Sequence, residues 1–206
     1  YDMAIIAREL LKHEKILEFS SVYEDYLRED TDNKFWLVNT NKLVRFYEGA
    51  DGLKTGHTDA AKYCLAATAK RDDLRLIAIV LGEENSQIRN SETMSLLDYG
   101  FNNYKIEILK TTDDVVREIS LDKATSSKIS LVPLDDIAIL SKKSADNMKY
   151  TYDIKVTNNS LPLKIGDEVG KIIVKDNSGK KIKEGALTVR ENVDTLNFLE
   201  LFGKSL

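Results

Sequence analysis

Residues 62–82 read KYCLAATAKRDDLRLIAIVLG, and this stretch decides the fold of the first half of the 206-residue chain. Two apolar runs flank the polar segment Arg71-Asp72-Asp73, which is typical of two strands joined by a short turn. In the second run, residues 74–81, nearly every position is apolar. Such a run predicts a strand that is covered on both faces, so the sheet should carry helices on both sides.

Helical patterns lie on either side of these strands. Apolar residues recur at helical spacing in residues 1–11, and a second helical pattern covers residues 16–27. A third covers residues 91–104, with Ser91 as the expected N-cap. The charged segment 28–34 is expected to be a loop.

From about residue 105 the sequence changes to short alternating segments separated by polar turns, which is typical of all-β domains. Asp-Asn-Ser-Gly at residues 176–179 indicates a hairpin, and Gly166-Asp167-Glu168 indicates another turn. We therefore expect an α+β fold class. Residues 1–104 should form a domain of antiparallel sheet and helices, and residues 105–194 a small all-β sandwich.

The composition excludes several classes of function. Charged residues make up 31% of the chain and mix both signs to a net charge of −4, so we expect no nucleic-acid partner. The single cysteine, Cys64, excludes an internal disulfide. Neither His13 nor His57 has a neighbour at zinc-ligand spacing, and we expect no metal and no cofactor. No apolar run approaches the roughly 20 residues of a membrane span.

The segment just before the strand pair, residues 51–58, reads DGLKTGHT and places a lysine and two threonines among glycines. A phosphate-binding loop needs Gly directly before its Lys, and Leu53 occupies that position, so this kind of site is excluded. Glycine weakens a strand unless a ligand or another backbone must come close. Gly56 therefore indicates access for a substrate along the strand edge.

These motifs together resemble a known family. DGLKTGHT, the strands after it, NTNKLV at residues 39–44 and YDMAIIARELL at residues 1–11 resemble the second half of the low-molecular-mass penicillin-binding proteins, the serine-type D-alanyl-D-alanine carboxypeptidases. Lys-Thr-Gly is one of three signatures of penicillin-binding proteins and class A β-lactamases, beside Ser-x-x-Lys and Ser-Asp-Asn. The resemblance covers essentially the whole chain. It implies a partial transpeptidase-like (β-lactamase-like) domain followed by the family's C-terminal β-sandwich.

The resemblance also implies a role for five residues. Lys54 and Thr55 bind the terminal carboxylate of a peptide ending in D-Ala-D-Ala, or of a β-lactam, beside Gly56. The backbone N–H of His57 is one donor of the oxyanion hole. Arg89 matches a family arginine near the carboxylate, although the sequence by itself equally allows an exposed arginine beside a helix. A cation with a directional donor suits a carboxylate, because charge-assisted hydrogen bonds are about twice as strong as neutral ones.

The sequence departs from the family at two positions close to the motif. The family commonly has Gly where Lys62 stands and Asn where Cys64 stands. The loop after His57 is therefore expected to differ in shape, and Cys64 is expected to be a buried cysteine within a strand.

The nucleophile that such an enzyme needs is not evident in the chain. Two segments match Ser-x-x-Lys, those that begin at Ser120 and Ser178, but the motif requires a helix, and both serines lie in predicted β or turn segments. Thr31-Asp32-Asn33 imitates Ser-x-Asn and lies in the predicted loop. We expect the chain to be a carboxypeptidase without its N-terminal portion and inactive by itself, neither hydrolysing D-Ala-D-Ala nor reacting with penicillin.

The predicted function is therefore a serine-type D-Ala-D-Ala carboxypeptidase that trims peptidoglycan stem peptides on the outer face of the bacterial cytoplasmic membrane. Two alternatives stay open: a β-lactamase, which the appended sandwich disfavours, and a non-catalytic, wall-associated scaffold or binding protein with the same fold. Residues 195–206 have helical spacing and are either the start of an amphipathic membrane anchor or a segment that docks on its own domain.

Overall fold

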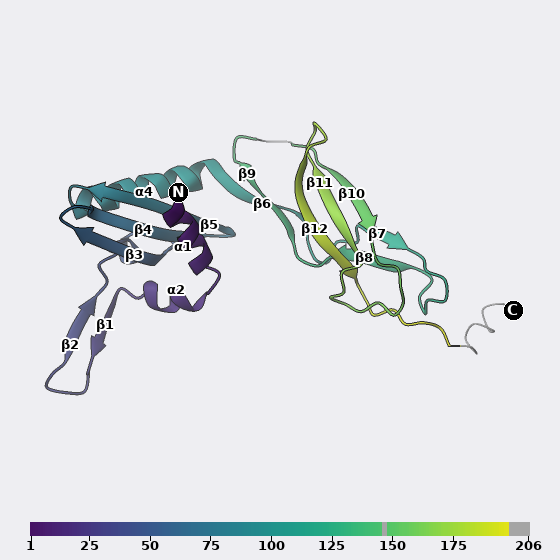
Figure 1. Ribbon diagram of the computed structural model, residues 1–206, viewed down its shortest axis with the longest axis horizontal. Helices are drawn as coiled ribbons and strands as arrows, with labels where there is room; N and C mark the ends of the chain where they lie inside the picture. The colour runs from purple at the N-terminus through teal and green to yellow at the C-terminus, as the bar shows by residue number, and fades with distance from the viewer. Residues whose placement is uncertain (146–147, 198–206) are drawn as a thin grey trace. The chain divides into compact units, whose positions relative to one another are not determined.

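The computed structural model describes residues 1–145 and 148–197. The chain divides into two compact units, Tyr1–Lys105 and Ile106–Leu206. The first combines helices with a sheet and a separate hairpin, and the second is built from strands (Figure 1).

The centre of the first unit is a three-stranded antiparallel sheet in the order β3-β4-β5. Its strands are β3 (Ala50–Thr58), β4 (Lys62–Arg71) and β5 (Leu74–Glu83). The predicted strand pair is confirmed, and Asp72 adopts a positive φ of 50° in the turn between β4 and β5. Because β4 is the central strand, one edge of β3 pairs with no strand in the described part of the chain.

Helices cover both faces of this sheet, as the apolar run predicts. The helices are α1 (Asp2–Leu10), α2 (Lys15–Ser20), α3 (Leu43–Phe46) and α4 (Ser86–Asn103). A Cβ atom at Gly52 would lie 2.7 Å from Ser20 Oγ of α2, and one at Gly100 of α4 would collide with Leu76 of β5. By the strand register Gly52 shares a face with Ile77, so Leu76 points to the other face. α2 and α4 therefore pack on opposite sides.

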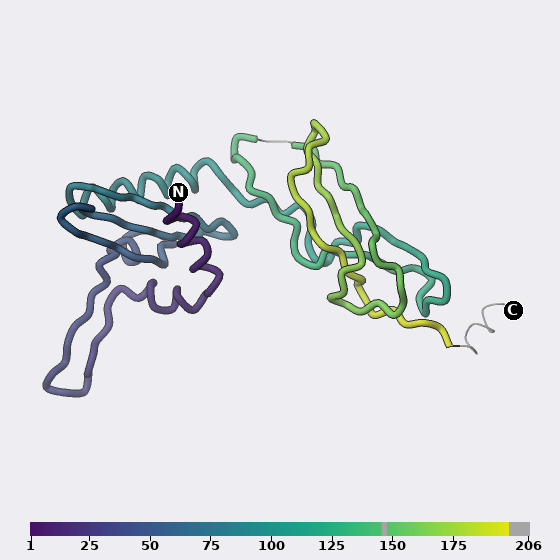
Figure 2. The backbone as a smooth tube through the Cα atoms, in the orientation of Figure 1, coloured from purple at the N-terminus to yellow at the C-terminus, as the bar shows by residue number. Residues whose placement is uncertain are grey.

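A two-stranded hairpin, β1 (Glu24–Leu27) and β2 (Phe35–Val38), projects from the body of the first unit (Figures 1 and 2). The prediction of a helix over residues 16–27 is wrong beyond Ser20. The Asn39 side-chain amide donates to the carbonyl oxygens of Ser20 and Val22 at 3.1 and 2.9 Å, which satisfies acceptors at the helix end. The aromatic and apolar residues that follow pair across the hairpin, Tyr26 with Trp36 and Leu27 with Phe35. Residues 28–34 form the predicted loop at its tip.

The long helix α4 confirms the third predicted helix but begins earlier than expected. Its N-cap is Asn85, whose Oδ1 accepts a hydrogen bond from the Ile88 N–H at 2.9 Å, and Ser91 lies inside the helix. The predicted start at Ser91 is wrong because asparagine is as good an N-cap as serine, and Asn85 precedes Ser91 by six residues. The early start places residues 86–90 within the helix, close to the free end of β3.

The second unit is all-β. A five-stranded antiparallel sheet has the order β10-β11-β12-β8-β7, and β6 pairs with β9. The strands are β6 (Tyr104–Lys110), β7 (Arg117–Ile119), β8 (Ile129–Pro133), β9 (Ile137–Lys142), β10 (Thr151–Val156), β11 (Gly170–Lys175) and β12 (Lys181–Val189). Positive φ angles at Gly166 and Gly179 confirm both predicted turns.

Two clusters of buried aliphatic residues stabilise this β unit. One contains Ile129, Leu131 and Val189 with neighbours from the loops, and the other joins Ile137 of β9 to residues of β11 and β12. A Cβ atom at Gly185 of β12 would collide with Ile137, so β9 packs directly on the bare backbone of β12. The β6–β9 pair packs on the five-stranded sheet, and these two layers form the predicted small sandwich.

The predicted anchor of residues 195–206 lies almost entirely outside the described residues, which end at residue 197. Among the helices in the described part of the chain, none is long and apolar enough to cross a membrane.

Candidate ligand-binding site at the free edge of strand β3

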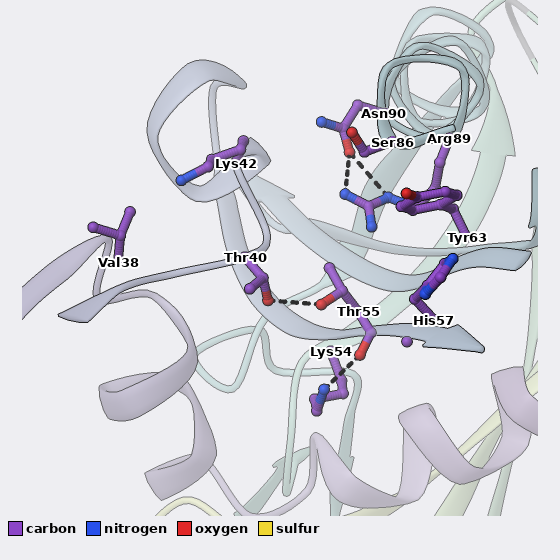
Figure 3. A pocket seen from close by; sticks show the side chains of 11 residues that line it. Val38, Thr40, Lys42, Lys54, Thr55, His57, Tyr63, Ser86, Arg89 and Asn90 are labelled. Carbon is purple, nitrogen blue, oxygen red and sulfur yellow. Dashed lines mark hydrogen bonds between the residues drawn. The ribbon is translucent and has the colours of Figure 1, made fainter. Parts of the chain in front are cut away.

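A pocket of about 470 Å³ lies at the end of β3 where the Lys-Thr-Gly motif is located (Figure 3). All five residues that the sequence singles out for binding line it: Lys54, Thr55, Gly56, His57 and Arg89. The remaining lining residues are Val38, Thr40, Lys42, Tyr63, Ser86 and Asn90. Four segments of the first unit thus meet here: the end of β2 with the loop after it, β3, β4 and the first turn of α4.

Alternation along β3 divides the motif between two faces. Lys54 pairs with Ala66 and shares a face with Gly52, whereas Thr55 shares the opposite face with its partner Leu65. Figure 3 shows Lys54 on one side of β3 and Tyr63 with Arg89 on the other. The free edge of the strand lies between them, so a ligand at this edge meets the amine from one face and the hydroxyl from the other.

Thr55 is buried, with 8% of its surface exposed, and its hydroxyl has a defined partner. Thr55 Oγ1 lies 2.7 Å from Thr40 Oγ1, and either hydroxyl can donate. Lys54 is exposed, and its Nζ donates to the Thr55 carbonyl oxygen at 2.5 Å. No carboxylate within the described residues pairs with Lys54, so its amine is accessible to an anionic ligand.

Arg89 lies in the first turn of α4 and is only 5% exposed. The alternative of an exposed arginine beside a helix is therefore wrong. Its Nε and Nη2 donate to Asn90 Oδ1 at 3.2 and 2.8 Å, an uncharged partner. Burial lowers the pKa of the Arg89 guanidinium, because no carboxylate in the described part of the chain compensates its charge. Two of its five N–H donors are used, and the others stay available.

The end of the strand is open and partly aromatic. His57 is exposed, and its ring lies 4.2 Å from the Tyr63 ring, measured between centroids, at a tilt of 44°. Gly56 is also exposed, and a Cβ atom there would meet only Cys64 Cβ at 3.9 Å. The protein itself therefore does not require a glycine at position 56 for steric reasons.

The pocket is strongly cationic. Lys42, Lys54 and Arg89 line it, and no aspartate or glutamate among the described residues does. Three cations without a carboxylate repel one another and gain from an anion between them. The hydroxyls of Thr40 and Thr55 add short donors beside the charges. Such a site suits a carboxylate or another small anion.

Comparisons with known proteins find similarity along almost the whole chain. Residues 1–85 match the family model described as D-alanyl-D-alanine carboxypeptidase, and residues 104–195 match that of the penicillin-binding protein 5 C-terminal domain. The chain is 40% identical to the D-alanyl-D-alanine carboxypeptidase DacF of Bacillus subtilis, an alignment that covers 100% of the chain and 53% of the relative. The chain belongs to the low-molecular-mass penicillin-binding proteins.

Further members of the family are similar over nearly the same length. The D-alanyl-D-alanine carboxypeptidase DacC of Escherichia coli is 31% identical over 96% of this chain and 48% of its own length. The structure of penicillin-binding protein 5 from Haemophilus influenzae has a TM-score of 0.68 at 26% identity and covers 94% of this chain and 56% of its own. The structure of penicillin-binding protein 3 from Streptococcus pneumoniae, at 23% identity and a TM-score of 0.69, supports the fold. The chain spans about half the length of the curated relatives it matches.

Neither serine that matches the family's Ser-x-x-Lys motif lies on a helix. Ser120 follows β7 and donates its hydroxyl proton to the Ser127 carbonyl oxygen at 3.0 Å. Ser178 lies in the turn between β11 and β12, where its Oγ donates to Asp176 Oδ1 at 2.6 Å. Thr31 and Asn33 lie in the loop of the β1–β2 hairpin and bond within that loop. None of these residues is among those that line the pocket.

The structure describes both positions at which the sequence departs from the family pattern. Lys62 adopts a positive φ of 53°, a conformation that glycine reaches without strain and lysine does not. The glycine common in the family therefore suits this backbone. Cys64 is half-buried rather than buried, with its Sγ 3.3 Å from the Ala61 carbonyl oxygen.

Analysis of the sequence missed Thr40, Lys42, Tyr63, Ser86 and Asn90. One signal was present, because Thr40 lies in the NTNKLV segment that carries part of the family resemblance. Tyr63 lies directly opposite His57 in the pairing of β3 with β4, so the register of the two strands places it at the site. Ser86 and Asn90 line the pocket because α4 begins at Ser86 and not at the predicted Ser91.

Proposed function

We propose that this chain provides the carboxylate-binding side of a serine-type D-Ala-D-Ala carboxypeptidase. One observation carries the proposal: Arg89 is a buried guanidinium without a carboxylate partner in the described residues, and it lines one pocket with Lys54 and Thr55. A buried charge without a partner is costly, and it is maintained where a ligand supplies the opposite charge. The terminal carboxylate of a stem peptide has that charge and the acceptor geometry.

The reaction follows from where the carboxylate binds. With the carboxylate at Lys54, Thr55 and Arg89, the peptide lies along the β3 edge, and its last peptide bond is placed toward His57. A serine from sequence outside these 206 residues attacks the carbonyl between the two D-alanines, the terminal D-alanine leaves as the amine, and water hydrolyses the acyl-enzyme. The His57 N–H then donates to the oxyanion.

The same site accounts for binding of β-lactam antibiotics, which carry a carboxylate beside a reactive amide. Because the substrate is a peptidoglycan stem peptide ending in D-Ala-D-Ala, we place the protein outside the cytoplasmic membrane, on the cell-wall side. The names of the relatives, D-alanyl-D-alanine carboxypeptidases, support the proposed reaction.

The test uses the intact protein that contains this chain, together with the chain by itself. We expect the intact protein to release D-alanine from an N-acylated peptide ending in D-Ala-D-Ala and to be labelled covalently by a fluorescent penicillin. We expect no label on the 206-residue chain. Label at Ser120 or Ser178 overturns the assignment of the nucleophile. An intact protein that neither releases D-alanine nor becomes labelled overturns the enzymatic proposal in favour of a non-catalytic binding protein.

A further inference from the structure

The pair of hydroxyls at the pocket has a role that the Lys-Thr-Gly motif alone does not specify. Thr40 and Thr55 are 15 positions apart in sequence, and their Oγ1 atoms lie 2.7 Å apart (Figure 3). Both residues line the pocket, Thr40 from the loop between β2 and α3 and Thr55 from β3. The contact therefore joins two separate segments directly at the site.

The loop that carries Thr40 is fixed on both sides by asparagines. Asn39 donates to the Ser20 and Val22 carbonyl oxygens, and its Oδ1 accepts from the Asn41 N–H at 2.9 Å. Asn41, with 1% of its surface exposed, donates from Nδ2 to the Gly52 carbonyl oxygen at 2.9 Å.

The Asn41 bond ties the loop to β3 itself, because Gly52 lies two residues before Lys54 on that strand. The position of Thr40 relative to Thr55 is thus set by buried or partly buried amide contacts. The Thr40 side chain itself is exposed, but the backbone that carries it is held by these amide contacts on both sides.

Counting protons decides which hydroxyl donates when an anion is bound. A threonine hydroxyl has one proton and two lone pairs, and an ionised carboxylate only accepts. Thr55 can donate to a ligand carboxylate only if it does not donate to Thr40. Thr40 must then donate to Thr55 Oγ1, which also polarises the Thr55 hydroxyl toward the ligand.

We propose that Thr40 is a positioning residue: its hydroxyl donates to Thr55 Oγ1 and directs the Thr55 proton to the carboxylate of the bound substrate. This inference rests on the proposed function. Replacing Thr40 by valine keeps the shape of the side chain and removes the donor, so the Thr55 proton loses its orientation. We expect a loss of about fivefold in rate, the size of one neutral hydrogen bond.

The experiment measures the second-order rate constant for acylation of the intact protein by penicillin and by penicillin methyl ester, which lacks the anionic acceptor. We expect Thr40→Val to lower the ratio of the free-acid rate to the ester rate about fivefold, and Thr40→Ser to restore it. Thr40→Ala repeats the test with a smaller side chain. In a Thr55→Val background, Thr40→Val should have no further effect, because the hydroxyl it orients is gone.

The outcomes separate the two proposals. If neither compound acylates the unchanged protein, the proposed function fails and the role of Thr40 fails with it. If the unchanged protein is acylated but Thr40→Val leaves the ratio unchanged, or if the two substitutions act independently, the role of Thr40 is overturned and the proposed function stands.

Discussion

Arg75 of β5 and Asp51 of β3 form a bidentate ion pair, with Nη1 2.8 Å from Oδ1 and Nη2 2.8 Å from Oδ2. Asp51 lies at the irregularity between Ala50 and Gly52, where the strand register shifts. Its carbonyl oxygen accepts from Ser20 Oγ at 2.7 Å. The pair therefore fixes the backbone three residues before Lys54 and connects the far strand of the sheet to the start of the motif.

We expect Arg75→Lys to lower the free energy of unfolding by about 1 kcal/mol, because lysine keeps the charge but cannot reproduce the planar two-bond geometry. Urea unfolding followed by circular dichroism measures the change. Asp51→Asn is the matched variant from the other side, and the double variant should lose less than the sum of the two. Strictly additive losses would show that the two side chains do not interact.

Gly49 precedes β3 and Gly56 lies near its end, and replacing each by alanine should change the free energy of unfolding by different amounts. At Gly49, φ is +82° and a Cβ atom would collide with the Lys70 carbonyl oxygen, so Gly49→Ala should cost about 2 kcal/mol or more of unfolding free energy. At Gly56 there is room, so Gly56→Ala should leave stability within about 1 kcal/mol of the unchanged protein.

The glycine variants also separate stability from ligand access. In the intact protein we expect Gly56→Ala to lower kcat/KM for the D-Ala-D-Ala peptide about tenfold, since the methyl group occupies the wall along which the ligand lies. A thermal melt of the same sample is the control for folding. Full activity of Gly56→Ala would show that no ligand approaches this backbone.

Replacing Arg89 should lower activity without lowering stability. Arg89→Gln removes a buried, uncompensated charge, so its unfolding free energy should stay equal or rise. In the intact protein, kcat/KM for the carboxylate-ended peptide should fall by about tenfold to a hundredfold, the range for a hydrogen bond to a charged group. Arg45→Gln, which removes an exposed cation that does not line the pocket, controls for net charge. A large loss of stability in Arg89→Gln would indicate a structural role for the arginine.

Tyr47 gives the first unit a pH dependence. Burial, together with the hydrogen bond that its hydroxyl donates to Asp98 Oδ1 at 2.7 Å, raises the pKa of the Tyr47 phenol above its ordinary value. The folded state keeps the phenol protonated while the unfolded chain ionises, so this contribution to stability is complete below about pH 10 and is lost as the pH rises further.

We expect the unfolding free energy of the unchanged protein, relative to Tyr47→Phe, to fall by up to about 1.4 kcal/mol per pH unit above pH 10. Tyr99→Phe, at an exposed position on α4, controls for the loss of one phenol. Parallel curves for the unchanged protein and Tyr47→Phe would contradict the burial argument. Guanidinium unfolding between pH 8 and about pH 11.5 covers the window in which the two curves should separate.

The sequence predicts the strand pair β4–β5 and most of the β unit because these segments carry their own signals. Continuous apolar runs mark buried strands, and glycine with aspartate or asparagine marks the turns at residues 166 and 179. The prediction of a helix over residues 16–27 is wrong beyond Ser20 for the opposite reason. The apolar spacing of residues 16–27 suits a helix throughout. The pairing of residues 24–27 with residues 35–38 makes them a strand, and the amide of Asn39 caps the chain just before it.

The residues of the site also differ in whether the sequence alone predicts that they lie together. Lys54, Thr55 and Gly56 are adjacent in sequence, so their common location is evident from the motif. Arg89 is 35 positions after Lys54, and only the family resemblance connects the two. Thr40 reaches Thr55 through a loop whose path depends on contacts with α2 and β3, and no local pattern specifies such a contact.

The most direct test of the account is a crystal structure of the intact protein, with its attacking serine replaced by alanine, bound to a peptide ending in D-Ala-D-Ala. We expect the peptide to lie along the free edge of β3, with its terminal carboxylate within about 3 Å of Thr55 Oγ1 and facing Arg89 and Lys54. A peptide whose carboxylate contacts none of these three residues would contradict the account.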